Sequence, residues 1–201
     1  MGVLDGAISY MAGPIDRADD HGIGWRRQFK KCLFDRHINI VFLDPTDKFE
    51  GLMEEVKDEK IYSDILRAKS DWEGLRNMFK KVQRVDLRMV DICDFLVAKI
   101  DTSIHMCGTY SEIDLCITEK KPILLIIEGG KKKCPSWLFG SVHYDFMFDS
   151  EDECADYLAR VDCGDVKIDD RWVLMRKGIK FLENSFSNKE MIKYGTVETR
   201  V

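Results

Sequence analysis

The sequence predicts an α/β fold organised around a parallel β-sheet. Residues 95–100 and 123–127 are continuous apolar runs rather than alternating ones, which is typical of parallel strands covered on both faces. Residues 110–119 between them are expected to form a helix, so that the three segments make a right-handed βαβ unit. Such units bind ligands beyond the carboxyl ends of their strands, and the helix should therefore begin on the ligand side of the sheet.

A first βαβ unit opens the chain. Residues 7–12 are short and apolar and stop at Gly13 and Pro14, as a strand that ends in a turn does. Residues 25–36 predict a helix, and residues 39–43 predict a second buried strand. The apolar side chains on one stripe of this helix are Trp25, Phe29, Cys32 and Leu33.

The middle of the chain, residues 46–83, is charged and holds few strand signals. Apolar residues at helical spacing predict an amphipathic helix in its second half, with Trp72 packed into the core. The first half is expected to be a solvated loop or a short helix. A further helix over residues 85–92 should then lead into the strand at residue 95.

After the second βαβ unit, the sequence predicts an edge or fifth strand over residues 142–148. A Ser-x-x-Glu capping box at Ser150 starts another helix, and a last helix is expected within residues 165–186. We therefore divide the chain into an α/β domain, residues 1–163, and a C-terminal helical extension with a tail, residues 164–201.

The composition is that of an ordinary globular protein, with 201 residues, 45% hydrophobic and 33% charged. The net charge of −5 argues against nucleic acid bound by a basic surface. No apolar run approaches the roughly 20 residues that cross a bilayer, and no signal peptide is evident. The seven cysteines are scattered without a Cys-x-x-Cys pair, so we expect reduced thiols, no metal site and a cytoplasmic location.

Glu112 is the first candidate for chemistry. A carboxylate near a helix N-terminus that faces a strand-end crevice can act as a nucleophile or a general base. The spacing of Thr109 and Glu112 equally describes a capping box, in which Glu112 would only accept the Thr109 N–H. The spacing leaves both roles open.

Four other polar residues are weaker candidates. Asp86 and Asp101 flank the strand at residues 95–100 and could accept a hydrogen bond from a sugar hydroxyl or a base edge, although a solvated cap or loop is the commoner role for a single Asp. His105 and His143 could shuttle a proton, but a lone His is more often a packed or surface residue.

The loop after the first strand is where α/β proteins commonly meet a ligand. It carries neither the G-x-G-x-x-G order of a dinucleotide site nor the Gly-Lys-Ser/Thr of a phosphate-binding loop. Arg17 could meet a phosphate. The residues of this loop are Gly13, Pro14, Ile15, Asp16 and Arg17.

Two segments resemble the nucleoside 2-deoxyribosyltransferase family. Residues 10–15, Tyr-Met-Ala-Gly-Pro-Ile, resemble its Tyr-Leu-Ala-Gly-Pro-Ile opening, and residues 107–112, Cys-Gly-Thr-Tyr-Ser-Glu, resemble its Gly-Thr-x-x-Glu segment. Asp86 before a strand and Lys121-Pro122 before the next one follow the family order. The resemblance covers about residues 6–160. The family is related to deoxynucleotide N-glycosidases, which share the Glu but release the base to water.

The resemblance implies a flavodoxin-like, doubly wound sheet of about five parallel strands, and an enzyme without a cofactor. Glu112 would attack C1′ of a 2′-deoxynucleoside, and a free nucleobase would then take the sugar from the deoxyribosyl-enzyme with net retention. Tyr10 would orient Glu112, and Asp86 would exchange a proton with the base. The substrate-binding residues would be Gly13, Pro14, Ile15, Asp16, Arg17, Gly108, Thr109 and His143.

The sequence departs from the family at two points. Where family members often carry an Asp that grips the deoxyribose hydroxyl, this chain has Met106, and Asp101 and His105 are the candidate substitutes. The family also completes each site with a polar residue of a neighbouring subunit, so a homo-oligomer is implied. Ser141, His143 and Tyr144 are the nearest candidates for that residue.

Two alternative functions stay open at this point. The first is a hydrolase of the same fold that acts on 2′-deoxynucleoside 5′-monophosphates, which would need backbone N–H groups and an Arg in the loop after the first strand. Gly13 and Arg17 permit this. The second is a non-catalytic nucleotide-binding module, and Met106 is the residue that favours it.

Overall fold

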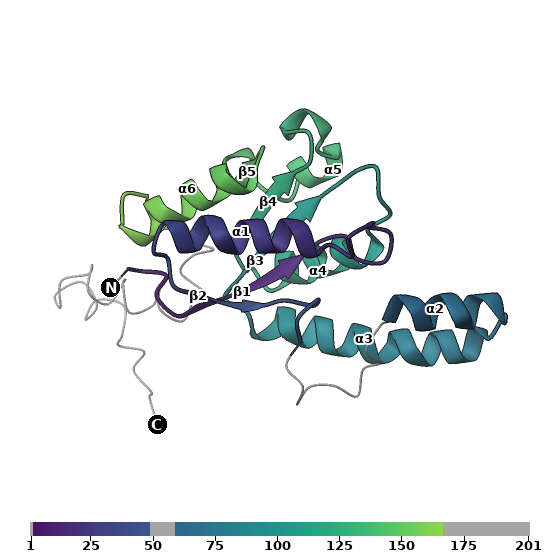
Figure 1. The fold of residues 1–201 in the computed structure, drawn as a ribbon. Helices are drawn as coiled ribbons and strands as arrows, with labels where there is room; N and C mark the ends of the chain where they lie inside the picture. Colours follow the sequence, from purple (N-terminus) through teal and green to yellow (C-terminus); the bar gives the residue numbers. More distant parts are fainter. Residues whose placement is uncertain (1, 49–58, 167–201) are drawn as a thin grey trace, which may run out of the picture.

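The computed structural model describes residues 2–48 and 59–166 (Figure 1). Its sheet has five strands in the order β2-β1-β3-β4-β5, and every neighbouring pair is parallel. This order confirms the flavodoxin-like, doubly wound sheet. The strands are β1 (Ala7–Ala12), β2 (Ile40–Leu43), β3 (Phe95–Ile100), β4 (Ile123–Ile127) and β5 (Met147–Phe148).

Helices cover both faces of this sheet. Side chains of α1 and α6 pack on one face, and side chains of α3, α4 and α5 pack on the other. Figure 1 shows α1 and α6 side by side. The helices are α1 (Ile23–Asp35), α2 (Glu59–Ala68), α3 (Trp72–Ile92), α4 (Cys107–Thr118), α5 (Ser136–Phe139) and α6 (Glu151–Asp162), with short 3₁₀ turns η2 (Lys131–Lys133) and η3 (Tyr144–Phe146).

The burial of the central strands accounts for their continuous apolar sequences. Every residue of β3 and β4 is buried, because both faces of the sheet are covered by helices. Along β3, Phe95 and Val97 join the core under α1 and α6, while Leu96 joins the core on the opposite face. Lys99 is the charged exception in β3, and it pairs with Glu128 and Glu151 at 2.7 Å each.

The region before β3 differs from the prediction. Residues 72–92 form one continuous helix, α3, rather than two, and residues 59–68 before it form the short helix α2. Trp72 is 63% exposed, so the expectation that it packs in the core is wrong. Asp71 accepts the Gly74 N–H (2.8 Å) and caps this end of α3, which lies beside α2 and beyond the sheet, so the sheet does not cover Trp72 (Figure 1).

The end of the described chain also corrects the prediction. The fifth strand is Met147–Phe148 only, because residues 144–146 turn as a 3₁₀ helix. The Ser150 hydroxyl accepts the Glu153 N–H (3.1 Å) as predicted, but the Glu153 carboxylate accepts the N–H of Asp149 instead of that of Ser150. The predicted helix at 165–186 lies almost wholly outside the described residues, and the domain division stays a prediction.

Two further properties concern the described residues alone. No helix within 2–48 and 59–166 is long and apolar enough to cross a bilayer. All seven cysteines fall within these ranges, and each is a free thiol.

Candidate active site

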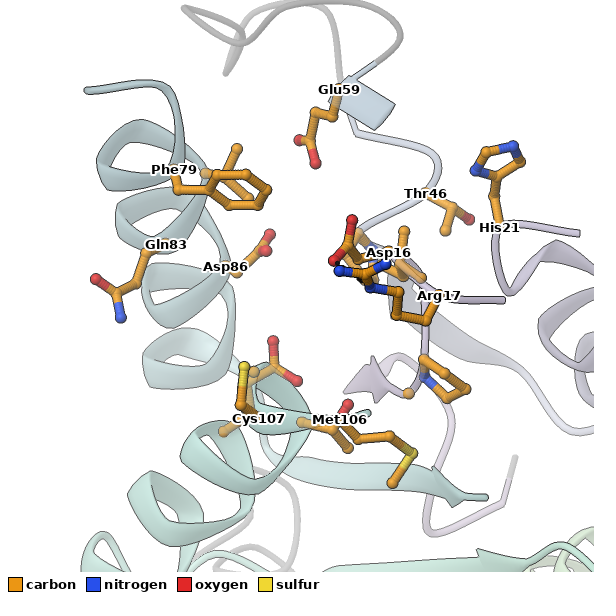
Figure 2. Close-up of a pocket in the computed structure, with 18 of the residues that line it drawn as sticks. Asp16, Arg17, His21, Thr46, Glu59, Phe79, Gln83, Asp86, Met106 and Cys107 are labelled. Carbon is orange, nitrogen blue, oxygen red and sulfur yellow. Dashed lines mark ion pairs between the residues drawn. The ribbon is translucent and has the colours of Figure 1, made fainter. Parts of the chain in front are cut away.

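A wide pocket of about 1680 Å³ opens beyond the carboxyl ends of the strands (Figure 2). Five stretches of chain line most of it: the loop after β1, the loop after β2, the start of α2, the middle of α3, and the segment that leads into α4 together with its first turns. This is the edge of the sheet where the βαβ units predicted a ligand. Its size suits a small organic molecule with room to spare.

Glu112 and Tyr10 meet at this pocket. The Tyr10 hydroxyl, from β1, donates a 2.7 Å hydrogen bond to Oε1 of Glu112, from α4. Tyr10 is fully buried and Glu112 is 9% exposed, on the wall of the pocket. The carboxylate of Glu112 is therefore held by a partner that is 102 residues away in the sequence.

The start of α4 rules out the capping-box role of Glu112. The helix begins at Cys107 with Met106 as its N-cap, three residues earlier than the sequence predicts. Thr109 consequently lies inside the helix, and Glu112 falls in the second turn rather than the first. The side chain of Glu112 is then free to face Tyr10.

Burial sets the protonation of this pair. It raises the pKa of Glu112 to about 7; the Tyr10 hydrogen bond opposes the rise, and nearby Asp86 adds to it. Burial, and then the charge of Glu112, raises the pKa of Tyr10 well above its usual value, so Tyr10 remains a donor at neutral pH. Near pH 7, Glu112 is thus present in both forms and can act as a nucleophile or as a base.

Asp86 lies in the same pocket. Figure 2 shows its carboxylate projecting from α3, below Glu59 and across from Asp16 and Arg17. Lys48, in the loop after β2, pairs with Asp86 at 2.9 Å. Sequence reasoning assigned no role to Lys48 or Glu59, because both lie in a charged stretch without a regular spacing.

The loop after β1 forms one wall, and all five of its predicted residues line the pocket. The side chain of Trp25 packs against Gly13, where an added Cβ would come within 2.8 Å of the ring. Gly13 is therefore required for packing. Arg17 is 62% exposed and pairs with Asp16 at 3.5 Å.

Arg26 is a supporting residue that the sequence analysis missed. It is 1% exposed, and its guanidinium donates to the carbonyls of Met11 (3.0 Å) and Gly22 (2.8 Å) and pairs with Asp44 at 3.4 Å. It thereby joins the end of β1, the following loop and the end of β2. Its position three residues before Phe29, on the apolar stripe of α1, was the available signal.

Asp101 and His105, the two candidate substitutes for the missing Asp, differ in their position relative to the pocket. Met106 is 4% exposed, lines the pocket and accepts the Asp101 N–H on its sulfur (3.4 Å). The Asp101 carboxylate accepts the N–H and hydroxyl of Ser103 and does not line the pocket. His105 does line it.

Gly108 and Thr109 also line the pocket, whereas His143 does not. His143 lies at the start of η3, where its ring accepts the Asp145 N–H (3.3 Å). A role for His143 in the site of a neighbouring subunit stays a prediction. Within residues 2–48 and 59–166, no cluster of three or more His, Cys, Asp or Glu could hold a metal ion.

The fold and the site together define a doubly wound α/β protein with a buried carboxyl–phenol pair in a strand-end pocket. Neither a protein-family model nor a curated protein sequence matches the chain. Among solved structures, a 2-deoxyribosyltransferase from the psychrotolerant bacterium Bacillus psychrosaccharolyticus is similar, with a TM-score of 0.51 and 18% identity over 78% of this chain and 97% of that one. A likeness at this identity establishes a shared fold.

Proposed function

We propose that this protein cleaves the N-glycosidic bond of 2′-deoxynucleosides and passes the sugar to another nucleobase. The observation that carries the proposal is the Tyr10–Glu112 hydrogen bond (2.7 Å) at the wall of the strand-end pocket. A carboxylate that is partly ionised near pH 7, yet shielded from water, is a suitable nucleophile for a sugar carbon. The similar fold of a 2-deoxyribosyltransferase supports the same bond type.

In the proposed reaction, Glu112 attacks C1′ from the face opposite the base. The C1′–N bond breaks, its electron pair leaves with the base, and a deoxyribosyl ester of Glu112 remains. A second base then attacks C1′ and releases the carboxylate, so two inversions give net retention. Tyr10 orients Glu112, and Asp86 takes part in the proton exchange with the base.

The remaining roles follow from the pocket wall. The loop from Gly13 to Arg17, together with Gly108 and Thr109, would hold the sugar and the base. His143 would reach the site only from another subunit of a homo-oligomer. In this proposal the substrates are a small deoxynucleoside and a free base, and the reaction uses no cofactor.

The charges of the pocket favour a nucleoside over its 5′-monophosphate. Its lining holds five carboxylates and four Lys or Arg residues. Arg17, the obvious phosphate ligand, already faces Asp16 (3.5 Å). A phosphate dianion would have to compete with that carboxylate. The lining carboxylates are Asp16, Asp47, Glu59, Asp86 and Glu112, and the cations are Arg17, Lys48, Arg76 and Lys80.

Transfer and hydrolysis are separated by two incubations. With deoxyinosine plus adenine, we expect deoxyadenosine to appear with the wild type and not with Glu112→Gln. Free base released only from deoxynucleoside monophosphates would favour the hydrolase instead.

A 2-fluoro-deoxynucleoside should leave an adduct on Glu112 that mass spectrometry detects. If no nucleoside or nucleotide is ever turned over while Glu112→Ala still binds them, the protein is a binding module.

A further inference from the structure

Lys48 is a buried cation in the pocket to which the proposed reaction gives no role. Its ammonium group lies 2.9 Å from Oδ1 of Asp86 and 3.6 Å from Oε1 of Glu59. Only 5% of its side chain is exposed, although lysine is almost never buried unless it is paired. The lysine is thus built into the wall between two carboxylates.

Three separate elements bring this cluster together. Lys48 follows β2, Glu59 is the first residue of α2, and Asp86 lies in the second half of α3. All three residues line the same pocket as Glu112. The Asp86 side chain is 15% exposed and points into the pocket, so it can contact a ligand while it holds Lys48 (Figure 2).

Several lining residues of the pocket can carry a proton, and those of this cluster lie at Asp86, the residue that exchanges a proton with the base in the proposed reaction. Glu112 cannot supply it, because it attacks as an ionised carboxylate. An ammonium group at 2.9 Å stabilises the ionised form of Asp86, and an ionised carboxylate has no proton to donate. The Lys48 ammonium carries three N–H groups. It is a proton carrier in contact with Asp86.

We propose that Lys48 stores the proton that the departing base takes, and that Asp86 relays it. This inference rests on the proposed function. As the C1′–N bond breaks, its electron pair goes to the base nitrogen, and a proton passes from Nζ of Lys48 through the Asp86 carboxylate to that nitrogen. Lys48 is then a neutral amine. When the second base attacks C1′, its N–H proton returns by the same route, and no other reactant is consumed.

Because Lys48 acts through Asp86, it is a positioning residue, and its test must depend on the leaving group. The base of 2′-deoxyadenosine needs a proton to depart, whereas the cationic base of 7-methyl-2′-deoxyguanosine departs as a neutral molecule without one. For Lys48→Met we expect kcat/KM to fall about 100-fold with 2′-deoxyadenosine, as for a lost general acid. With the 7-methyl substrate we expect a change within about 3-fold.

Two further variants separate proton storage from charge and from folding. Lys48→Arg keeps the positive charge beside Asp86, but a guanidinium does not release its proton near neutral pH. It should therefore fold like the wild type and still lose activity on 2′-deoxyadenosine alone. Lys81→Met removes an exposed lysine of α3 outside the pocket and should leave both substrates unaffected.

Three results would overturn the role of Lys48 while the proposed function stands. They are an equal loss on both substrates in Lys48→Met, no loss on either, or full activity of Lys48→Arg on 2′-deoxyadenosine. Wild-type protein that cleaves neither substrate would instead remove the proposed function, and the Lys48 proposal with it. Thermal unfolding of each variant shows whether the comparison is made on folded protein.

Discussion

The Tyr10 hydroxyl donates a 2.7 Å hydrogen bond to Oε1 of Glu112, and this bond links the first strand of the sheet to the helix that follows β3. Tyr10 has almost no exposure, so its position is fixed by the core. Sequence spacing left Glu112 open to either a capping role or a chemical role. The bond holds its carboxylate at the wall of the pocket. It also lowers the pKa of Glu112, against the larger effect of burial.

Replacing Tyr10 with Phe should change the pH dependence of activity. The hydrogen bond from Tyr10 lowers the pKa of Glu112, against the effect of burial that brings it to about 7. Without the bond that pKa rises, so the acid limb of the kcat/KM profile should move to higher pH, and kcat should fall about 10-fold or more. Tyr110→Phe, on α4 but outside the pocket, is the control. An acid limb that stays in place in Tyr10→Phe would contradict this account.

Replacing Glu112 with Gln should stabilise the fold at alkaline pH. The pKa of Glu112 is raised from 4.5 to about 7 in the folded protein, so the protonated form favours folding. The stability that protonation confers is complete at acidic pH and is lost as the pH rises through about 7. A glutamine side chain carries no charge at any pH, so we expect the Glu112→Gln variant to gain about 1 kcal/mol over the wild type at pH 5 and about 3 kcal/mol at pH 8.

Urea unfolding at the two pH values measures this difference. Asp114→Asn changes the same charge at an exposed site of α4, and its effect should be small at both pH values. A gain for Glu112→Gln that is equal at pH 5 and pH 8 would show that Glu112 ionises normally in the folded protein.

Arg26→Met should destabilise the protein by about 3 kcal/mol. The change removes the donors to the carbonyls of Met11 and Gly22 and leaves the buried Asp44 with Lys30 as its remaining cation. Chemical denaturation at pH 7 tests this, with the exposed Arg27→Met as the matched control. Comparable stability of the two variants would mean that Arg26 does not hold the strand ends together.

Two glycine-to-alanine changes should differ clearly in their effect on stability. Gly22 has a φ of 71°, and an added Cβ would lie 2.1 Å from the carbonyl oxygen of Pro14. Gly22→Ala should cost about 2 kcal/mol or more. Gly108 lies in α4 with nothing within 4 Å of its would-be Cβ, so Gly108→Ala should be neutral or stabilise by about 0.5 kcal/mol. Thermal unfolding compares the pair, and a loss for Gly108→Ala as large as that for Gly22→Ala would contradict the predicted difference.

Much of the fold could be predicted because its signals are local. The continuous apolar runs at 95–100 and 123–127 determined two buried parallel strands, and the structure confirms both. The flavodoxin-like, doubly wound sheet of about five parallel strands followed from the resemblance to a known family, and it is also confirmed. Local signals failed for Trp72, whose helical spacing predicts a core position. It is exposed, because α3 begins at this residue beyond the area that the sheet covers.

By itself, the sequence determined the parallel sheet, the edge at which a ligand is expected and the carboxylates that could serve there. The family resemblance already implied that Tyr10 orients Glu112, and only the tertiary structure decided that Glu112 lies in the second turn of α4 and that Lys48 faces Asp86. The physical reason is that periodicity records which face of an element is buried, over a few residues. A contact between distant elements depends on where each helix begins and how it packs, and α4 begins at Cys107, three residues before the start that the sequence predicts.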